Sequence, residues 1–288
     1  MGHARFQLLG ALLLTFAPHG AVAAQDYPPD ISDAVLEVYK TVNGVDLNAW
    51  VFFPDGHRRT DSKPAMVFFF GGGWVGGNPA QFERQARALS SRGMVAILAD
   101  YRVLNRHGAR PSSGVEDAKS AVMWVRQHAR ELGVDPDRIG AAGGSSGGHL
   151  AAATATLPGF DGGQEGRSLS AKPNALLLFN PVVVVAPVEG RFDPSARLRE
   201  RMSGPLLDLS PFHHVGDDAP PTLIVHGTED DSVPFDTVAL YCEHVTRMGG
   251  VCEVVPYEGA GHGFFNSSPY YELTLQESIR FLESIDWI

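Results

Sequence analysis

Runs of nearly all apolar residues alternate along this chain with longer segments in which apolar residues recur at helical spacing. The apolar runs cover residues 65–70, 94–99, 138–142, 175–179, 222–225 and 251–257. Continuous apolar runs of this length are typical of strands that are buried on both faces of a parallel sheet. The helical segments cover residues 79–92, 115–132, 149–156 and 270–284. This alternation predicts an α/β architecture with a mostly parallel central sheet flanked by helices.

The first β-rich segments have a different pattern. Residues 35–40 and 47–53 are separated by a turn that contains Asn43 and Gly44, which indicates a hairpin and therefore antiparallel strands at the edge of the sheet. Residues 187–221 are irregular and rich in Pro, Arg and Asp, and we interpret them as an excursion over the sheet. Because the sequence contains no internal repeat and no linker, we expect a single domain with a minimal cap over residues 25–288.

The first 24 residues differ from the rest of the chain. His3 and Arg5 precede an apolar run over residues 6–17, which is shorter than the roughly 20 residues that a membrane span requires. Small residues follow at 21–23, where a signal peptidase would cut. We therefore expect residues 1–24 to be a signal peptide and the protein to be secreted or periplasmic; the alternative is a buried N-terminal helix. We expect no membrane span elsewhere.

Composition and charge exclude several classes of protein. The chain has 288 residues, of which 44% are hydrophobic, too many for a disordered chain. Its 23 basic and 33 acidic residues give a formal net charge of −10, which argues against a nucleic-acid partner. A chain of this length buries most of its unfolded surface, so it needs no structural metal or dense disulfide framework to fold.

The two cysteines flank a predicted turn. Cys242 lies in a helix-like segment and Cys252 begins a strand-like one, with Gly249 and Gly250 between them. A helix that returns onto the next strand brings such residues together, so we predict one disulfide in an oxidising compartment. The alternative is two buried free thiols. Neither cysteine has a metal-ligand spacing to the other.

A glycine-rich turn carries the first candidate for chemistry. Residues 144–148 fit the pattern G-x-S-x-G with Ser146 at the centre, between a predicted strand and a predicted helix. This setting is that of a nucleophile elbow, in which a strained turn exposes a serine. Residues 143–147 fit the same pattern with Ser145 at the centre. We favour Ser146 because Gly147 and Gly148 lead directly into the helix; an ordinary glycine-rich turn is the alternative to an elbow.

A second glycine-rich segment follows the predicted strand at 65–70. Gly71, Gly72 and Gly73 allow backbone amides to approach a ligand closely. In α/β-hydrolases, one oxyanion donor comes from such a loop and another from the residue after the nucleophile. We therefore predict donors at Gly72 or Gly73 and at Gly147; the alternative is a flexible turn.

A serine nucleophile requires a base, and the base requires an acid that orients it. His262 lies in a glycine-rich loop after the last predicted strand and suits the role of base. The loop after residues 222–225 holds three candidate acids, Glu229, Asp230 and Asp231, and composition does not choose among them. The chain order of serine, acid and histidine is that of α/β-hydrolases.

These motifs together resemble a known family. They comprise Phe70-Gly71-Gly72-Gly73-Trp74, Asp100-Tyr101-Arg102, residues 134–139, 144–148 and 226–234, and Gly261-His262-Gly263-Phe264. The chain resembles α/β-hydrolase fold esterases of the acetyl-esterase and hormone-sensitive-lipase-like branch, and is similar to secreted bacterial feruloyl and acetyl-xylan esterases. The resemblance implies a triad of Ser146, Asp230 and His262. The sequence departs from lipase-like relatives at Phe70, where they have a histidine.

The motifs and the resemblance lead to one expected function. We expect a secreted serine esterase that needs no cofactor and no metal, and that acts on small-molecule or polysaccharide esters of the acetyl or feruloyl type. Trp74, Tyr101 and Phe264 are expected near the site as pocket residues; the alternative is that these aromatic residues at strand ends only pack. The alternatives are a lipase-like or amide-hydrolysing enzyme with the same machinery, and a non-catalytic binding protein on a hydrolase scaffold.

Overall fold

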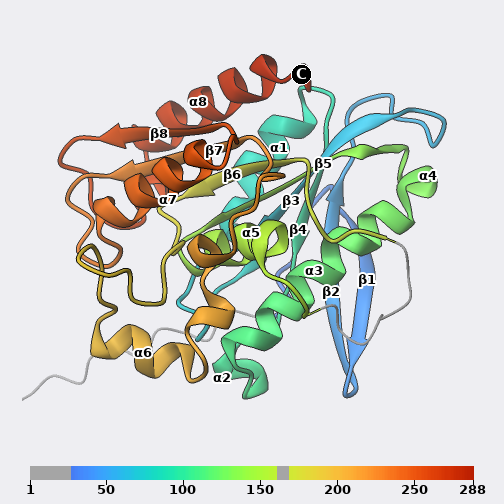
Figure 1. Ribbon diagram of the computed structural model, residues 1–288. Helices are drawn as coiled ribbons and strands as arrows, with labels where there is room; N and C mark the ends of the chain where they lie inside the picture. Colours follow the sequence, from blue (N-terminus) through green and yellow to red (C-terminus); the bar gives the residue numbers. More distant parts are fainter. Residues whose placement is uncertain (1–26, 161–168) are drawn as a thin grey trace, which may run out of the picture. The chain divides into compact units, whose positions relative to one another are not determined.

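A computed structural model describes residues 27–160 and 169–288 of the chain (Figure 1). Within these residues one sheet has eight strands in the order β1-β2-β4-β3-β5-β6-β7-β8. The strands are β1 (Val35–Val42), β2 (Val45–Phe52), β3 (Lys63–Phe69), β4 (Val95–Ala99), β5 (Val134–Gly144), β6 (Ala175–Phe179), β7 (Thr222–Gly227) and β8 (Cys252–Tyr257). Strands β1 and β2 form an antiparallel hairpin and β2 pairs antiparallel with β4, whereas the other pairs are parallel. The predicted fold class, including the N-terminal hairpin, is confirmed.

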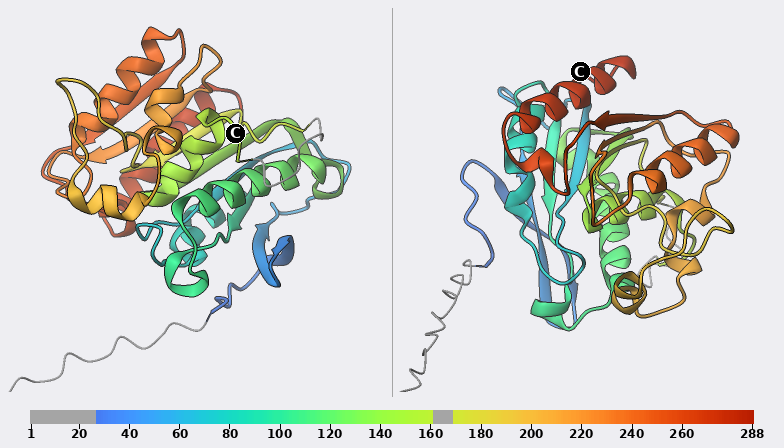
Figure 2. Two further views of the ribbon diagram at one scale, coloured as in Figure 1. Left: turned by 60° about the horizontal axis from the view of Figure 1, so that its bottom comes forward. Right: turned by 90° about the vertical axis from the view of Figure 1, so that its left-hand side faces the viewer.

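Helices cover both faces of the sheet. The α-helices are α1 (Glu83–Ser90), α2 (Leu104–His107), α3 (Pro111–Gln127), α4 (Ala129–Leu132), α5 (Ser146–Thr156), α6 (Ala196–Met202), α7 (Phe235–Arg247) and α8 (Tyr270–Ser284). Short 3-10 helices are η1 (Pro79–Phe82), η2 (Leu207–Leu209), η3 (Pro211–His214) and η4 (Phe264–Asn266). In Figure 2, α1 and α8 lie on one side of the sheet, and α5 and α7 lie on the other. These elements belong to one compact unit, Ile31–Ile288.

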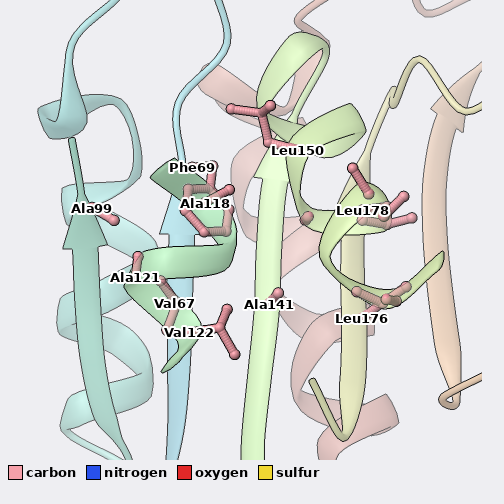
Figure 3. Close-up of a cluster of buried hydrophobic side chains, with 14 of the residues drawn as sticks. Val67, Phe69, Ala99, Ala118, Ala121, Val122, Ala141, Leu150, Leu176 and Leu178 are labelled. Carbon is pink, nitrogen blue, oxygen red and sulfur yellow. The ribbon is translucent and has the colours of Figure 1, made fainter. Parts of the chain in front are cut away.

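Alternating residues of the central strands supply the two cores. Val67 and Phe69 of β3 pack with α3 and α5 on one face, and Met66 and Phe68 pack with α1 and α8 on the other. Figure 3 shows the first of these clusters, where Leu150 of α5 meets side chains of the parallel strands. Burial on both faces explains why these strands read as continuous apolar runs.

Several elements differ from their predicted form. The helix expected at 115–132 begins four residues earlier, with Pro111 in its first turn, and divides at His128 into α3 and α4. The strand expected at 138–142 is longer, since β5 begins at Val134. Strand β8 is not buried as expected: it is an edge strand, and all of its residues are partly or fully exposed.

Three further predictions concern the signal peptide, the disulfide and membrane spans. The predicted signal peptide, residues 1–24, lies outside the described residues, and its removal stays a prediction. Cys242 of α7 and Cys252 of β8 form a disulfide, with their Cα atoms 5.2 Å apart. In the part of the chain that the structure describes, no helix has the length and apolar character needed to cross a membrane.

Candidate active site

The carboxyl ends of the parallel strands bring the candidate residues together. Ser145 follows β5, Asp230 lies in the loop after β7, and His262 lies in the loop after β8. Two further segments reach the same edge, the glycine-rich loop after β3 and Asn180 directly after β6. Ligands of open α/β sheets bind at this edge.

Ser145, His262 and Asp230 form a continuous hydrogen-bonded chain. His262 Nδ1 lies 2.7 Å from Asp230 Oδ2, and His262 Nε2 lies 2.9 Å from Ser145 Oγ. A carboxylate only accepts hydrogen bonds, so the Nδ1–H donates to Asp230. This tautomer leaves Nε2 free to accept the proton of the Ser145 hydroxyl, which is the arrangement that a general base needs.

The structure contradicts the choice of Ser146 as the serine of this chain. The Ser146 side chain is fully buried, and its Oγ has no hydrogen-bond partner among the described residues. Ser145 instead has the strained backbone of an elbow, with φ 53° and ψ −118°. The helix does begin at Ser146, as the glycines after it suggested, but the serine that contacts His262 is half-buried and precedes the helix as its N-cap.

The glycines two residues on either side of Ser145 explain the register of the elbow. A Cβ atom on Gly147 would overlap the backbone carbonyls of Phe69 and Phe70 at the end of β3. A Cβ atom on Gly143 would overlap the backbone of Gly147 itself. The turn therefore closes over β3 only when both positions lack side chains, and Ser145 is the residue midway between them.

Asp230 is the acid that contacts the histidine, while Glu229 and Asp231 do not. Its Oδ1 accepts hydrogen bonds from the backbone N–H groups of Ser232 at 2.9 Å and Val233 at 2.8 Å. Burial by itself raises the pKa of Asp230, but the hydrogen bonds from His262 and Val233 outweigh it and hold that pKa below its ordinary value. The carboxyl group is therefore ionised and oriented at both oxygens.

The glycine-rich loop after β3 provides candidate oxyanion donors. The Gly71 N–H already donates to Gln81 Oε1 at 2.6 Å. In the described part of the chain, the Gly72 and Gly73 amides have no such partner, and both residues line the cavity beside Ser145. Their φ values of 136° and 63° lie in the region that favours glycine.

The assignment of Gly147 as the second oxyanion donor changes, because the nucleophile is Ser145 and not Ser146. The donor after an elbow serine is the N–H of the next residue, which for Ser145 is the N–H of Ser146. This amide lies in the first turn of α5, where N–H groups have no intrahelical acceptor. The role predicted for the Gly147 amide therefore passes to Ser146, and Gly147 instead permits the close contact with β3.

A buried histidine, not predicted from the sequence, fixes the oxyanion loop. Trp74 has an unusual φ of 60°, and its indole Nε1–H donates to His149 Nδ1 at 3.3 Å. His149 Nε2–H donates in turn to the Leu209 carbonyl at 2.7 Å. Burial lowers the pKa of His149 to about 4, so the ring is neutral and holds one tautomer. The only signal in the sequence was its place directly after the elbow.

A cavity of about 650 Å³ opens beside Ser145 and His262, within the range of small-molecule sites. Of the predicted pocket residues, Trp74 lines it. Tyr101 does not, because its fully buried ring stacks on Phe70 and its hydroxyl donates to the Phe70 carbonyl at 2.7 Å. Phe264 also lies outside the lining and packs against Tyr257 and Tyr270; its neighbour Phe265 lines the cavity.

Asn180 is a second residue that the sequence did not single out. Its backbone N–H donates to the Val225 carbonyl at 2.9 Å, and its Oδ1 accepts from the Gly263 N–H at 3.0 Å. Gly263 follows His262, so this contact ties the histidine loop to β6 and β7. The signal would have been a polar residue directly after a buried strand.

Comparison with known proteins agrees with this geometry. Residues 51–181 match the BD-FAE family model, and residues 199–284 match that of the prolyl oligopeptidase family. Solved structures of esterase 2 from Thermogutta terrifontis include one that is 46% identical, with a TM-score of 0.86, covering 92% of this chain and 96% of that one. The chain belongs to the α/β-hydrolase family of carboxylic ester hydrolases. The predicted resemblance is therefore confirmed.

Curated relatives agree at lower identity. Esterase LipC of Mycobacterium tuberculosis is 31% identical over 73% of this chain and 56% of its own length. A probable isoprenylcysteine alpha-carbonyl methylesterase of Arabidopsis thaliana is 29% identical over 71% of this chain and 46% of its own length. The chain thus spans about half the length of these curated relatives.

Proposed function

We propose that this protein hydrolyses carboxylic esters through Ser145, His262 and Asp230. The observation that carries the proposal is the hydrogen-bonded chain from Ser145 Oγ through His262 to Asp230. Ser145 Oγ attacks the ester carbonyl while His262 Nε2 takes its proton. Asp230 holds the Nδ1–H tautomer and stabilises the imidazolium that forms.

The remaining steps use the same groups. The amides of Gly72, Gly73 and Ser146 hold the tetrahedral oxyanion, each donor contributing about 10²–10³-fold in rate. His262 then gives its proton to the leaving alcohol, and the acyl group stays on Ser145. In the second half, His262 takes a proton from water, which attacks the acyl-enzyme and releases the acid. No step requires a metal or a cofactor.

We propose small acyl esters as the substrates, of the acetyl or feruloyl type and carried on carbohydrates or similar alcohols. The cavity of about 650 Å³ suits a compact ester, and the segment between β6 and β7 holds only the short helices α6, η2 and η3 as a cap. The Thermogutta structures include propionate-bound and butyrate-bound forms and one phosphonylated by sarin, which supports small acyl groups and a reactive serine.

The two adjacent serines provide a matched test of the nucleophile. Ser145→Ala is expected to reduce kcat for p-nitrophenyl acetate by about 10⁶-fold. Ser146→Ala removes only a buried hydroxyl without a partner and keeps the backbone N–H, so its activity should stay within a few-fold of wild type. Peptide mapping after fluorophosphonate labelling should find the adduct on Ser145. Loss of activity in Ser146→Ala with retention in Ser145→Ala would refute the assignment.

A second candidate function is amide hydrolysis by the same residues, which the match of residues 199–284 to the prolyl oligopeptidase family favours. Turnover of p-nitroacetanilide compared with p-nitrophenyl acetate discriminates between the two. Export to the periplasm or the medium is also proposed, on the signal-like pattern of residues 1–24. N-terminal sequencing of the exported protein should begin near residue 25, and an intact Met1 would contradict cleavage.

A further inference from the structure

Helix α6 places two arginines in the wall of the catalytic cavity. Arg197 and Arg201 are four residues apart, so they lie on the same face of the helix, and both line the cavity that contains Ser145. The Arg201 guanidinium lies directly against Gly73, where a Cβ atom would collide with its Nη1. A half-buried cation therefore touches the loop that supplies the candidate oxyanion donors.

These two cations have no acidic partner. Among the residues that the structure describes, neither Arg197 nor Arg201 has a carboxylate within ion-pair distance. The third arginine of the helix, Arg199, pairs with Asp193 instead. Asp193 also lines the cavity, but its charge is compensated by Arg199, and Asp231 is the other carboxylate in the lining.

The chemistry of the guanidinium group indicates what would occupy this position. Its planar fork binds carboxylates through two parallel hydrogen bonds, and a concave site lined by unpaired cations attracts anions. The protein as a whole carries a net charge of −10, so a local pair of cations has to offset the repulsion of an anionic substrate. A site for purely neutral acyl groups would gain nothing from two unpaired arginines.

We propose that Arg201, with Arg197 beside it, forms a subsite for a carboxylate carried by the substrate near the scissile ester. The proposal rests on the proposed function of Ser145 and specifies the substrate class as esters with an anionic acid half or alcohol half. Oxyanion donors lie about 3 Å from the oxyanion and a charge-assisted hydrogen bond spans about 2.8 Å. Because Arg201 touches Gly73, a carboxylate roughly three or four bonds from the ester carbonyl carbon reaches the guanidinium.

Two substrate pairs test the subsite and separate its two sources. Monoethyl succinate carries the carboxylate on the acid half, and ethyl 4-methylpentanoate replaces it by an isopropyl group. The acetate ester of 3-hydroxypropanoate carries it on the alcohol half, and 3-methylbutyl acetate is the neutral counterpart. Hydrolysis is followed by pH-stat titration, and the measured quantity is the ratio of kcat/KM for the charged ester to that for its neutral counterpart.

In at least one pair, Arg201→Gln should lower this ratio by about tenfold, as expected for a lost hydrogen bond to a charged group. Arg197→Gln should lower it less. Arg191→Gln is the control, because it removes one positive charge from the same segment between β6 and β7 while neither Arg191 nor its partner Glu243 lines the cavity, and it should leave the ratio unchanged.

Three results would overturn the subsite. If the ratio is unchanged in Arg201→Gln, Arg201 does not bind a substrate carboxylate and the proposed subsite is wrong. An equal loss for charged and neutral esters assigns Arg201 to the loop or the oxyanion rather than to a substrate carboxylate. An equal fall of the ratio in Arg191→Gln assigns the effect to the general positive charge of the segment between β6 and β7. Failure of the proposed function is distinct, because wild type would then hydrolyse none of the four esters and Ser145 would not react with a fluorophosphonate.

Discussion

Replacing Asp230 by Asn tests whether the carboxylate controls the tautomer of His262. The Oδ1 atom accepts two backbone N–H groups, from Ser232 and Val233, so the oxygen of an asparagine amide must occupy that position. The amide nitrogen is then forced to face His262 Nδ1, where Oδ2 lies now at 2.7 Å. An N–H donor there requires Nδ1 to accept, which moves the imidazole proton to Nε2.

The consequence for catalysis follows from the position of that proton. With the proton on Nε2, the histidine presents a donor to Ser145 Oγ at the 2.9 Å contact and has no lone pair to take the hydroxyl proton. The same change in a serine protease triad lowers kcat by about 10⁴-fold. We expect a loss of this size here, equivalent to about 5.4 kcal/mol of transition-state stabilisation.

The assay compares Asp230→Asn with Asp231→Asn on p-nitrophenyl acetate. Asp231 is the exposed neighbour, and its Oδ1 accepts only from the Ser232 hydroxyl at 3.1 Å, so its variant should keep kcat within a few-fold of wild type. Circular dichroism should show an unchanged fold in both. If Asp230→Asn retained kcat within about tenfold of wild type, the structural reasoning on the tautomer would be refuted.

Two further predictions concern stability. Burial lowers the pKa of His149 in the folded protein to about 4, against an ordinary value of 6.5. Between these pH values the unfolded chain binds a proton that the folded protein does not, so the free energy of unfolding should fall by about 3 kcal/mol as the pH drops from 6.5 to 4. Urea unfolding at several pH values should show this component in wild type and lack it in His149→Gln; identical pH profiles would contradict it. Gly147→Ala should destabilise the fold by about 1–3 kcal/mol, since its Cβ meets strand backbone, whereas Gly261→Ala adds a Cβ in ordinary contact and should leave the midpoint of urea unfolding nearly unchanged. Equal midpoints for the two variants would count against the packing argument.

The fold was accessible from the sequence because its signals are local. The buried strands are recognisable as nearly continuous apolar runs. The hairpin is recognisable by its Asn43-Gly44 turn. The ends of elements were less accessible. Residues 251–257 were expected to form a buried strand although they include Glu253 and Pro256, and the place of β8 at the edge of the sheet depends on the strand order.

The sequence predicted which loops form the candidate site, but not which side chains in those loops contact one another. His262 and the three acidic candidates followed from chain order and from the rule that strands end at a common edge. The choice between Ser145 and Ser146 depends on the contact of Gly147 with the backbone of Phe69 and Phe70, which lie far from it in the sequence. Tyr101 looked like a pocket residue because it follows a strand, yet its ring is directed into the core.

The sequence by itself therefore determined the α/β class, the loops that meet at the strand ends, and the kinds of residue available there. Tertiary structure decided which serine contacts His262 and which carboxylate orients that histidine. It also placed His149 and Arg201 in contact with the oxyanion loop. The physical reason is the range of the interactions involved. Periodicity and turn chemistry act over a few neighbouring residues, whereas the direction of a side chain at an elbow depends on what packs against it from another strand.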